Sequence, residues 1–297
     1  MSEKALQTIG LTKSYGAVRA LRGVDLEVQP GEVFGFLGPN GSGKTTTIRC
    51  LLDLIRPDGG SLHVLGLDPQ KDSLAVRARV GYLPGELAFE GNMTVEASLR
   101  LLGRLRGNHL DWGFVRQMAE RLDLDLTPRF KNLSKGNKQK VGVVQALMHR
   151  PELLLLDEPT SGLDPLMQQV VMNLVREARE NGATVFFSSH ILSEVQEIAD
   201  RVAIIRKGLV VETASVDALM QRSLRRVRVR FASPLNGTDL ANLTGVTILG
   251  RDDHSLSLQV EGEMDLLLKA LAHYHVSDLE SERPSLEEIF MAYYEEQ

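Results

Sequence analysis

Unbroken apolar runs, separated by segments with helical periodicity, dominate the first two thirds of the chain. Residues 33–37 and 184–188 are such runs, and residues 153–158 read LLLLDE, four leucines followed by two acids. A strand that is apolar on both faces is typical of a parallel sheet that helices cover on each side. Residues 45–55 carry apolar side chains at helical spacing directly after the first run. The pattern therefore predicts an α/β fold around a buried sheet.

Weaker patterns surround this predicted core. Residues 8–11 and 24–28 alternate apolar and polar side chains, which predicts short strands with one buried face. The stretch from about 87 to 135 has no buried-strand signal and contains two amphipathic segments, so we interpret it as a helical insertion. We assign the strands, the helices between them and this insertion to a first domain over residues 1–222.

The pattern changes after residue 222. The segment VRVRF alternates apolar and charged residues, which predicts an amphipathic strand. The segments that follow predict the order strand, helix, strand, strand, helix, strand, which is the order of a split-βαβ, ferredoxin-like sandwich. The segment SLEEIF opens with a capping box and predicts a last helix over residues 286–294. We therefore expect a small C-terminal α+β accessory domain over residues 223–297.

Composition is that of an ordinary globular protein. The 297 residues are 43% hydrophobic and 25% charged, and the formal net charge is −5. This balance provides no global basic field that would attract nucleic acid or anionic lipid. Cys50 is the single cysteine, so no disulfide forms within the chain, which fits a reducing cytoplasm. No apolar run approaches the ~18 residues of a membrane span, so we expect any membrane role to come through a partner chain.

Arginines cluster locally in the segment RRVRVRF near the start of the expected C-terminal domain. Both a nucleic-acid surface and a solvated strand face fit such a cluster. Aromatic residues that could stack on bases do not accompany these arginines, which favours the solvated face. We therefore expect no nucleic-acid partner.

Glycines follow directly after the apolar run at residues 33–37. The sequence GPNGSGKT fits the pattern G-x-x-x-x-G-K-[ST], in which successive backbone N–H groups curl around an anion. Lys44 adds a positive charge for the β- and γ-phosphates of a nucleotide, and the Thr45 hydroxyl can bind Mg²⁺. A helix begins near Lys44 and directs its positive end at the same phosphates. The predicted nucleotide-binding residues of this loop are Gly38, Pro39, Asn40, Gly41, Ser42, Gly43, Lys44, Thr45 and Thr46.

Acidic residues stand at the carboxyl end of the four-leucine run, where doubly wound sheets place their ligands. We expect Asp157 to hold Mg²⁺ and Glu158 to orient and polarise the attacking water. The alternative is a solvated turn, which the presence of a phosphate loop makes the weaker interpretation. His190 ends the next buried strand. A lone histidine is usually structural, but at this position it could bond the γ-phosphate.

Other positions stay ambiguous when they are taken alone. Tyr15 precedes the phosphate loop and is either an adenine-stacking side chain or a half-buried surface aromatic. Ser134 stands before a helix, where it fits both an ordinary cap and a second phosphate contact. Asp164 and Pro165 follow a tight loop and predict another helix start, with proline at its favoured first position.

These motifs, in this order, resemble the nucleotide-binding subunit of an ATP-binding cassette (ABC) transporter over residues 5–220. The resemblance makes Tyr15 the adenine-stacking residue, Glu158 the catalytic glutamate and His190 the switch histidine. Asp157 corresponds to the Walker B aspartate and Asp164 to the D-loop aspartate. The implied fold is a P-loop NTPase cassette of the ABC type, with a mixed sheet core, an antiparallel β-subdomain and a helical insertion. ATP and Mg²⁺ are the implied cofactors.

The resemblance also implies a dimer. In this family two cassettes pair head to tail around two ATP molecules, and the signature motif of one cassette closes on the γ-phosphate held by the other. The residues that match the signature motif here are Ser134, Lys135, Gly136 and Asn137. Lys135 replaces a glycine of the usual LSGGQ, and Asn137 replaces its glutamine.

A second departure concerns the glutamine loop. The segment reads YLPGE, so Gly85 stands where the family has a glutamine that contacts Mg²⁺ and senses the membrane partner. Two substitutes fit this gap, the Glu86 side chain or a water molecule. The forms SKGNKQK and YLPGE, together with the C-terminal PSLEEIF, resemble the ABC-2 branch of bacterial exporters.

The function that follows from the resemblance is ATP hydrolysis in a subunit that drives a separate membrane permease, most simply for export of a drug, antibiotic, lipid or similar substrate. Its expected partners are the permease subunits and a second copy of itself, and its expected place is the cytoplasmic face of the membrane. The alternative is a soluble ABC ATPase that acts on nucleic acid or ribosomes. Relatives of that kind usually carry two cassettes or a long coiled-coil insertion, and this chain has one cassette and no sustained heptads.

Overall fold

The structure is a computed structural model, which describes residues 4–89, 91–107, 110–222, 225–233, 240, 243–261 and 263–282. The chain divides into two compact units, Met1–Ala214 and Ser215–Gln297, whose relative placement is not determined. The sequence pattern places the boundary after residue 222, so the structure differs by assigning residues 215–222 to the second unit. None of the described helices combines the length and the apolar character that crossing a membrane requires.

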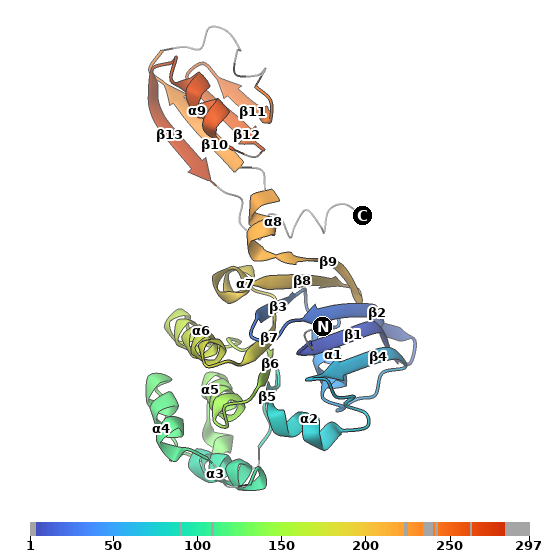
Figure 1. Cartoon of the computed structure of the whole chain (residues 1–297). Coiled ribbons are helices and arrows are strands. Elements are labelled where there is room, and N and C mark those ends of the chain that lie inside the picture. Colours follow the sequence, from blue (N-terminus) through green and yellow to red (C-terminus); the bar gives the residue numbers. More distant parts are fainter. Residues whose placement is uncertain are drawn as a thin grey trace. The chain divides into compact units, whose positions relative to one another are not determined.

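A six-stranded sheet forms the centre of the first unit (Figure 1). Its strand order is β5 (Val80–Leu83), β6 (Leu153–Asp157), β7 (Thr184–Ser189), β3 (Val33–Leu37), β8 (Arg201–Arg206) and β9 (Leu209–Ser215). The first five strands are parallel. Every residue of β3, β6 and β7 is buried, as the unbroken apolar runs predicted. Their carboxyl ends therefore lie side by side at one edge of the sheet.

A second, antiparallel sheet of three strands has the order β2 (Val18–Val28), β1 (Leu6–Tyr15) and β4 (Gly59–Val64). The first two strands are longer than their alternation predicted. Register shifts interrupt β1 between Thr8 and Leu11, around Gly10 with its left-handed φ of 58°. A bulge of this kind turns the following side chains to the other face and breaks the period of two.

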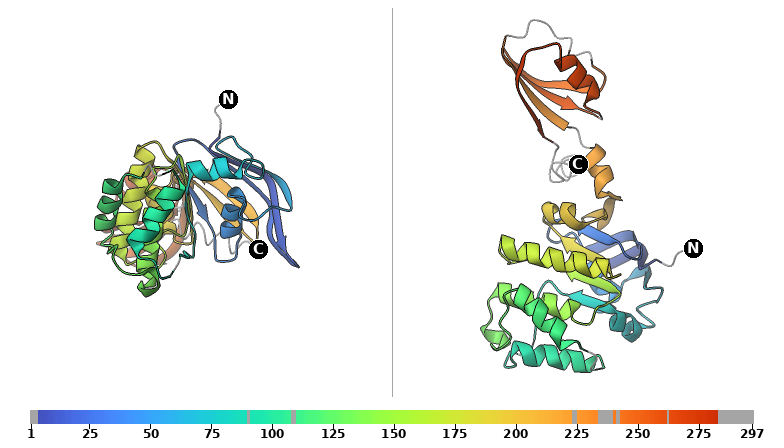
Figure 2. Two further views of the ribbon diagram at one scale, coloured as in Figure 1. Left: turned by 90° about the horizontal axis from the view of Figure 1, so that it is seen from below. Right: turned by 60° about the vertical axis from the view of Figure 1, so that its left-hand side comes forward.

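Helix α1 (Lys44–Leu51) lies between the two sheets and contacts β2, β4 and β6 (Figures 1 and 2). Its buried residues join the main hydrophobic core, in which Phe34 and Phe186 stack at 5.8 Å between ring centroids. The predicted extension of this helix to residue 55 is wrong, because Asp53 adopts a left-handed φ of 51°. A further helix, α2 (Ser73–Arg79), was not predicted, since Val76 is its only buried side chain.

The opposite face of the central sheet is covered by α6 (Pro165–Glu180) and α7 (Leu192–Ile198), which contact each other and β7. Helix α5 (Lys135–Leu147) packs on β5 and also contacts α3 (Val95–Leu105) and α4 (Trp112–Arg121). These last two helices and the short helix η1 (Phe130–Asn132) are the regular elements described within residues 87–135. Figure 1 shows α3 and α4 grouped beside α5, away from the antiparallel sheet.

The second unit contains an antiparallel sheet with the order β11 (Val246–Asp252), β12 (Ser255–Val260), β10 (Arg225–Phe231) and β13 (Val276–Glu282). In chain order this is 2-3-1-4, the arrangement of a ferredoxin-like sandwich. Helix α9 (Asp265–Leu271) buries Leu267 and Leu271 in its core, and α8 (Val216–Arg222) precedes the sheet. The predicted helix 286–294 lies outside the described residues. The predicted α/β character of the first domain and α+β character of the C-terminal domain are confirmed.

The arginine cluster lies on the exposed face of this second sheet. Arg226, Arg228 and Arg230 alternate with the buried apolar residues of β10, as predicted. In the register of β10 with β13 each of the three stands opposite an acid: Arg226 opposite Glu282, Arg228 opposite Glu280 and Arg230 opposite Asp278. Cross-strand pairs of opposite charge stabilise a sheet modestly. The positive charge of this face is therefore balanced by the neighbouring strand.

Candidate active site

The glycine-rich loop connects the end of β3 to the start of α1, as the sequence predicted. Gly38 leaves no room for a side chain, because a Cβ there would lie 2.4 Å from the Ile205 carbonyl oxygen. Gly43 has a φ of 117°, and its Cβ would lie 2.9 Å from the Ala20 carbonyl oxygen. Both glycines therefore allow the loop to pass close to neighbouring backbone while its N–H groups remain available at the start of α1.

Lys44 extends from the first turn of α1 across this loop. Its Nζ donates to the Gly38 carbonyl at 2.6 Å and to the Pro39 carbonyl at 3.3 Å. It also lies 3.5 Å from Glu158 Oε1. Burial lowers the pKa of the Lys44 ammonium, while the nearby Glu158 and Asp157 carboxylates oppose that shift. The lysine thus joins the glycine-rich loop to the acids at the end of β6.

Asp157 is the last residue of β6 and is 1% exposed. Its Oδ1 accepts a hydrogen bond of 2.6 Å from Ser188 Oγ, on the neighbouring strand β7. Its Oδ2 is buried and has no hydrogen-bond partner among the described residues. A buried carboxylate oxygen without a partner is costly, and an oxygen-seeking cation or its bound water satisfies it. The oxygen chemistry therefore fits a Mg²⁺ ion bound beside the phosphates of a nucleotide.

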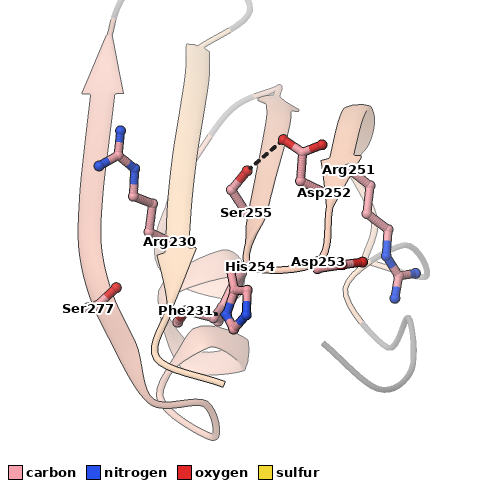
Figure 3. A pocket seen from close by; sticks show the side chains of 8 residues that line it. All are labelled: Arg230, Phe231, Arg251, Asp252, Asp253, His254, Ser255 and Ser277. Carbon is pink, nitrogen blue, oxygen red and sulfur yellow. Dashed lines mark hydrogen bonds between the residues drawn. The ribbon is translucent and has the colours of Figure 1, made fainter. Parts of the chain in front are cut away.

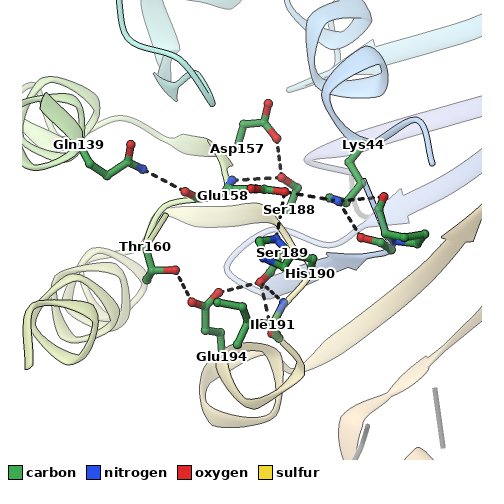
Figure 4. A network of polar contacts seen from close by, with 12 residues as sticks. Lys44, Gln139, Asp157, Glu158, Thr160, Ser188, Ser189, His190, Ile191 and Glu194 are labelled. Atoms are coloured by element: carbon green, nitrogen blue, oxygen red, sulfur yellow. Dashed lines mark hydrogen bonds and ion pairs between the residues drawn. The ribbon is translucent and has the colours of Figure 1, made fainter. Parts of the chain in front are cut away.

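Glu158 follows Asp157 with a left-handed backbone, φ 52°. For a residue other than glycine this conformation costs roughly 1–3 kcal/mol and persists only when its surroundings impose it. The Glu158 N–H donates to the Ser188 carbonyl at 3.1 Å, and Gln139 Nε2 donates to the Glu158 carbonyl at 2.9 Å. The carboxylate is directed at His190, whose Nδ1 lies 3.2 Å from Oε1. Lys44, Asp157, Glu158 and His190 are therefore brought together (Figure 4).

Glu194, in the first turn of α7, connects the two loops that carry Glu158 and His190. Its Oε2 accepts from Ser189 Oγ at 2.7 Å, and its Oε1 accepts from Thr160 Oγ1. Ser189 Oγ in turn accepts from the Ile191 N–H at 2.8 Å. Burial raises the pKa of the Glu194 carboxyl, which is 6% exposed, although the two hydroxyl hydrogen bonds oppose this effect. Figure 4 shows this network beside the Glu158–His190 contact.

The predicted signature residues occupy the start of α5. Ser134 caps the helix by accepting from the Asn137 N–H at 3.2 Å, and both Ser134 and Lys135 are exposed. Gly136 packs against the D-loop of the same chain, since a Cβ there would lie 2.9 Å from the Gly162 carbonyl oxygen. None of these residues contacts the glycine-rich loop in the described hydrogen bonds and ion pairs. Ser134 does cap a helix, which is one of its two interpretations.

Asp164 caps α6. Its Oδ1 accepts from the Leu166 and Met167 N–H groups, each at 3.1 Å, and Pro165 is the first helical residue, as predicted. Tyr15 lies at the end of β1 and is 48% exposed. Its ring faces the Lys13 ammonium at 5.9 Å from the centroid. About half of the tyrosine is exposed to solvent, which is compatible both with stacking and with a half-buried surface aromatic.

Gly85 follows β5 and faces Asp157 across the sheet edge. A Cβ at position 85 would lie 3.3 Å from Asp157 Oδ2, the same oxygen that has no partner. Glu86, the substitute considered from the sequence, is exposed. Gly85 therefore places backbone rather than a side chain next to the buried oxygen.

One of the described pockets in the C-terminal unit does not involve these residues. It has a volume of about 770 Å³ and lies at the turn between β11 and β12 (Figure 3). Its lining contains charges of both signs, and Ser255 Oγ donates to Asp252 Oδ2 at 3.3 Å. The eight lining residues are Arg230, Phe231, Arg251, Asp252, Asp253, His254, Ser255 and Ser277. The nucleotide motifs all lie in the first unit.

Sequence reasoning did not identify Gln139, Ser188 and Glu194 as part of the site. Each is buried and polar, and buried polar side chains normally have a specific hydrogen-bond partner. Glu194 accepts from the nearby Ser189, but the contacts to Glu158, Asp157 and Thr160 that bring the three residues into the site span 19 to 34 residues of the chain. A local pattern of apolar and polar residues does not encode such distant pairs. The available signal was the presence of strand-end hydroxyls and of an extra glutamine in the segment SKGNKQK.

Comparison with known families agrees with this geometry. The family model described as "ABC transporter" matches residues 21–161, which include the glycine-rich loop and Asp157. A model described as "ATP-binding protein DrrA1-3-like, C-terminal domain" matches residues 216–294. A model described as "AAA domain, putative AbiEii toxin, Type IV TA system" matches residues 128–195 within the cassette.

Individual proteins match over most of the chain. The daunorubicin resistance ATP-binding protein DrrA3 of Streptomyces coeruleorubidus is 36% identical over 98% of this chain and 96% of its own. The bacitracin transport ATP-binding protein BcrA of Bacillus licheniformis is 37% identical over 76% of this chain and 75% of its own. A solved ATP-binding subunit of an ABC transporter is 29% identical, with a TM-score of 0.66 over 73% of this chain and 92% of its own. The chain therefore belongs to the family of ABC transporter ATP-binding subunits, which bind and hydrolyse ATP.

Proposed function

We propose that this ABC ATPase drives a separate membrane permease that exports a drug, antibiotic, lipid or similar substrate. Two observations support export. The relatives described above are named for daunorubicin resistance and bacitracin transport. In addition, residues 216–294, which follow the cassette, match the model of the DrrA-like C-terminal domain. The subunit would then act at the cytoplasmic face of the membrane, held there by the permease.

The observation that carries the catalytic part of the proposal is the placement of Glu158. Its Oε1 lies 3.2 Å from His190 Nδ1 and 3.5 Å from Lys44 Nζ. One carboxylate oxygen therefore faces both His190, which is predicted to contact the γ-phosphate, and the phosphate-binding lysine. A carboxylate in this place can accept a proton from a water that attacks the γ-phosphate. In this assignment Glu158 polarises the water and His190 contacts the γ-phosphate.

The remaining site residues receive supporting roles. The loop residues 38–46 bind the phosphates through backbone N–H groups and Lys44, and Tyr15 stacks on the adenine. Thr45 and Asp157 hold Mg²⁺, because Asp157 Oδ2 is the buried oxygen that lacks a partner. Mg²⁺ supplies charge neutralisation for the transferred phosphoryl group. Because Gly85 has no side chain to offer the metal, we assign the place of the family's glutamine to a water that arrives with the metal.

The dimer forms the second part of the proposal. Ser134 and Lys135 are exposed at the start of α5, and they have no described contact with the phosphate loop of their own chain. The N-terminus of a helix is a favourable site for phosphate. We assign Ser134, Lys135, Gly136 and Asn137 to the ATP held by a second copy of the chain, with Asp164 beside that contact. ATP binding would close this head-to-tail dimer, and hydrolysis would reopen it.

The permease would dock on residues 85–102, which follow β5 and enter the helical insertion. Glu86 is an exposed acid at the start of this segment. A charge reversal, Glu86→Lys, should therefore reduce ATP-driven transport more than it reduces the ATPase activity of the isolated subunit. An equal loss of both activities would indicate a catalytic role for this segment.

Co-purification tests the whole assignment. The tagged full-length chain should bring down a multi-span membrane protein from detergent-solubilised membranes of its own cells. Recovery of ribosomes or nucleic acid without such a protein would favour the alternative, a soluble ABC ATPase. Transport of candidate drugs into inverted vesicles that contain both proteins would then identify the substrate class.

A further inference from the structure

Two separate segments hold the peptide groups on either side of Glu158. On the N–H side, Glu158 donates to the Ser188 carbonyl and to Ser188 Oγ, at 3.1 and 3.2 Å. On the carbonyl side, Gln139 Nε2 donates to the Glu158 carbonyl at 2.9 Å and to the Pro159 carbonyl at 3.0 Å (Figure 4). The left-handed backbone of Glu158 is therefore fixed from both ends.

Glutamine suits the second of these positions for a chemical reason. Its side-chain amide has two N–H donors on one nitrogen, and here each can serve one of two consecutive carbonyl groups. Glutamate suits the position less well, because its carboxylate presents acceptors to the same carbonyls. Asparagine also suits it less well, because its side chain is one methylene shorter. The side chain of Gln139 is 6% exposed, so water does not readily replace it.

We propose that Gln139 is a positioning residue, whose side-chain amide holds Glu158 in the conformation that aims its carboxylate at the γ-phosphate. The proposal rests on the catalytic role proposed for Glu158. Gln139 lies on α5, the helix that begins after Ser134. The same rigid helix therefore carries both the proposed contact to the partner's ATP and the hydrogen bonds that set the position of Glu158.

This arrangement predicts a selective kinetic defect. Loss of the two hydrogen bonds frees the Glu158 peptide to leave its strained conformation, and the carboxylate moves from its place beside His190. A misplacement of about 1 Å can reduce a rate by about 10²-fold. Gln139 contacts neither the glycine-rich loop nor Lys44 in the described hydrogen bonds, so ATP affinity should not change.

Gln139→Met is the test variant, and Lys140→Met is its matched control. Lys140 is the next residue of the same helix, is 9% exposed, and also donates to a backbone carbonyl, that of Asp123 at 3.2 Å. We expect Gln139→Met to lower kcat by about 10²-fold with an unchanged Kd for ATP. Lys140→Met should keep kcat within roughly twofold of wild type. Equal losses in the two variants, or full activity of Gln139→Met, would refute the proposal.

Gln139→Glu provides a second variant of similar volume that lacks the donors, and it should reproduce the kcat defect if the protein remains folded by circular dichroism. The decisive measurement combines Gln139→Met with Glu158→Gln and follows single-turnover hydrolysis. If Gln139 acts only through Glu158, the double variant should be no slower than Glu158→Gln alone. Losses that multiply would overturn the assignment of Gln139 while leaving Glu158 catalytic. Near-normal turnover of Glu158→Gln alone would instead refute the proposed catalytic role itself.

Discussion

The Nδ1 atom of His190 lies 3.2 Å from Oε1 of Glu158, although the two residues belong to loops that follow different strands. The parallel pairing of β6 with β7 produces this contact, because it places Asp157 beside Ser188 and so aligns the two strand ends. The Glu194 network then ties Thr160 to Ser189, one residue before the histidine. The acid and the histidine are thus positioned by the same sheet edge that receives the glycine-rich loop.

Lys44→Ala should abolish tight ATP binding. The substitution removes the buried ammonium that crosses the glycine-rich loop and approaches Glu158. Nucleotide titration by calorimetry should show a large rise in Kd. Lys71→Ala, which removes an exposed lysine paired with Asp68, is the control and should bind ATP normally. An unchanged affinity in Lys44→Ala would mean that the loop is not the nucleotide site.

Gly85→Ala should weaken metal binding more than nucleotide binding. The added Cβ would lie 3.3 Å from Asp157 Oδ2, in the space that we assign to water next to the metal. Mn²⁺ titration followed by electron paramagnetic resonance, in the presence of ATP, measures this directly. Gly91→Ala is a suitable control, because its Cβ would meet only the Lys131 side chain at 3.4 Å. Equal Mn²⁺ affinity in the two variants would contradict the role given to this space.

Glu194→Gln should change how stability depends on pH. Burial raises the pKa of the Glu194 carboxyl above its ordinary value of 4.5. A raised pKa in the folded state means a stability contribution that is complete below the ordinary value and lost as pH rises through the raised value. The neutral glutamine does not titrate, so the free energy of unfolding of Glu194→Gln should improve relative to wild type as pH rises. Urea unfolding at several pH values measures the difference, and a constant difference would contradict the burial argument.

The strands of the central sheet could be predicted from the sequence because their environment is uniform. Residues 153–157 and 33–37 are buried on both faces, so an unbroken apolar run has one explanation. The end of α1 could not be predicted in the same way. Apolar spacing continues through Ile55, yet Asp53 has a left-handed φ that ends the helix. The periodicity of apolar side chains contains no information about φ.

Part of the candidate site was accessible to the same reasoning. Lys44, Asp157 and Glu158 follow strands directly, and their motifs have a fixed chemical meaning. Gln139 was hidden because its two acceptors are backbone carbonyls, which every residue has. When a side chain bonds to a backbone carbonyl, the partner residue can be of any type, so the sequence carries no sign of the pair.

Truncation after Arg222 should leave ATP binding intact. The second sheet has its own core, around Val229 and Leu258, and the nucleotide motifs lie in the first unit. If the apolar surface of the C-terminal domain packs only within that domain, ATPase activity and dimerisation should also persist. If the domain pairs across the dimer, ATP-dependent dimerisation should weaken while the affinity of the monomer for ATP holds. Complete loss of ATP binding would place the domain boundary elsewhere.

The most direct test of the central claim is ATP turnover by Glu158→Gln, measured together with its mass by size-exclusion chromatography and light scattering in ATP. The substitution keeps the size of the side chain but removes the carboxylate that faces His190 and Lys44. We predict that turnover falls by about 10²–10⁴-fold and that ATP traps a stable dimer. Near-normal turnover, or a monomer that hydrolyses ATP at the wild-type rate, would contradict the account.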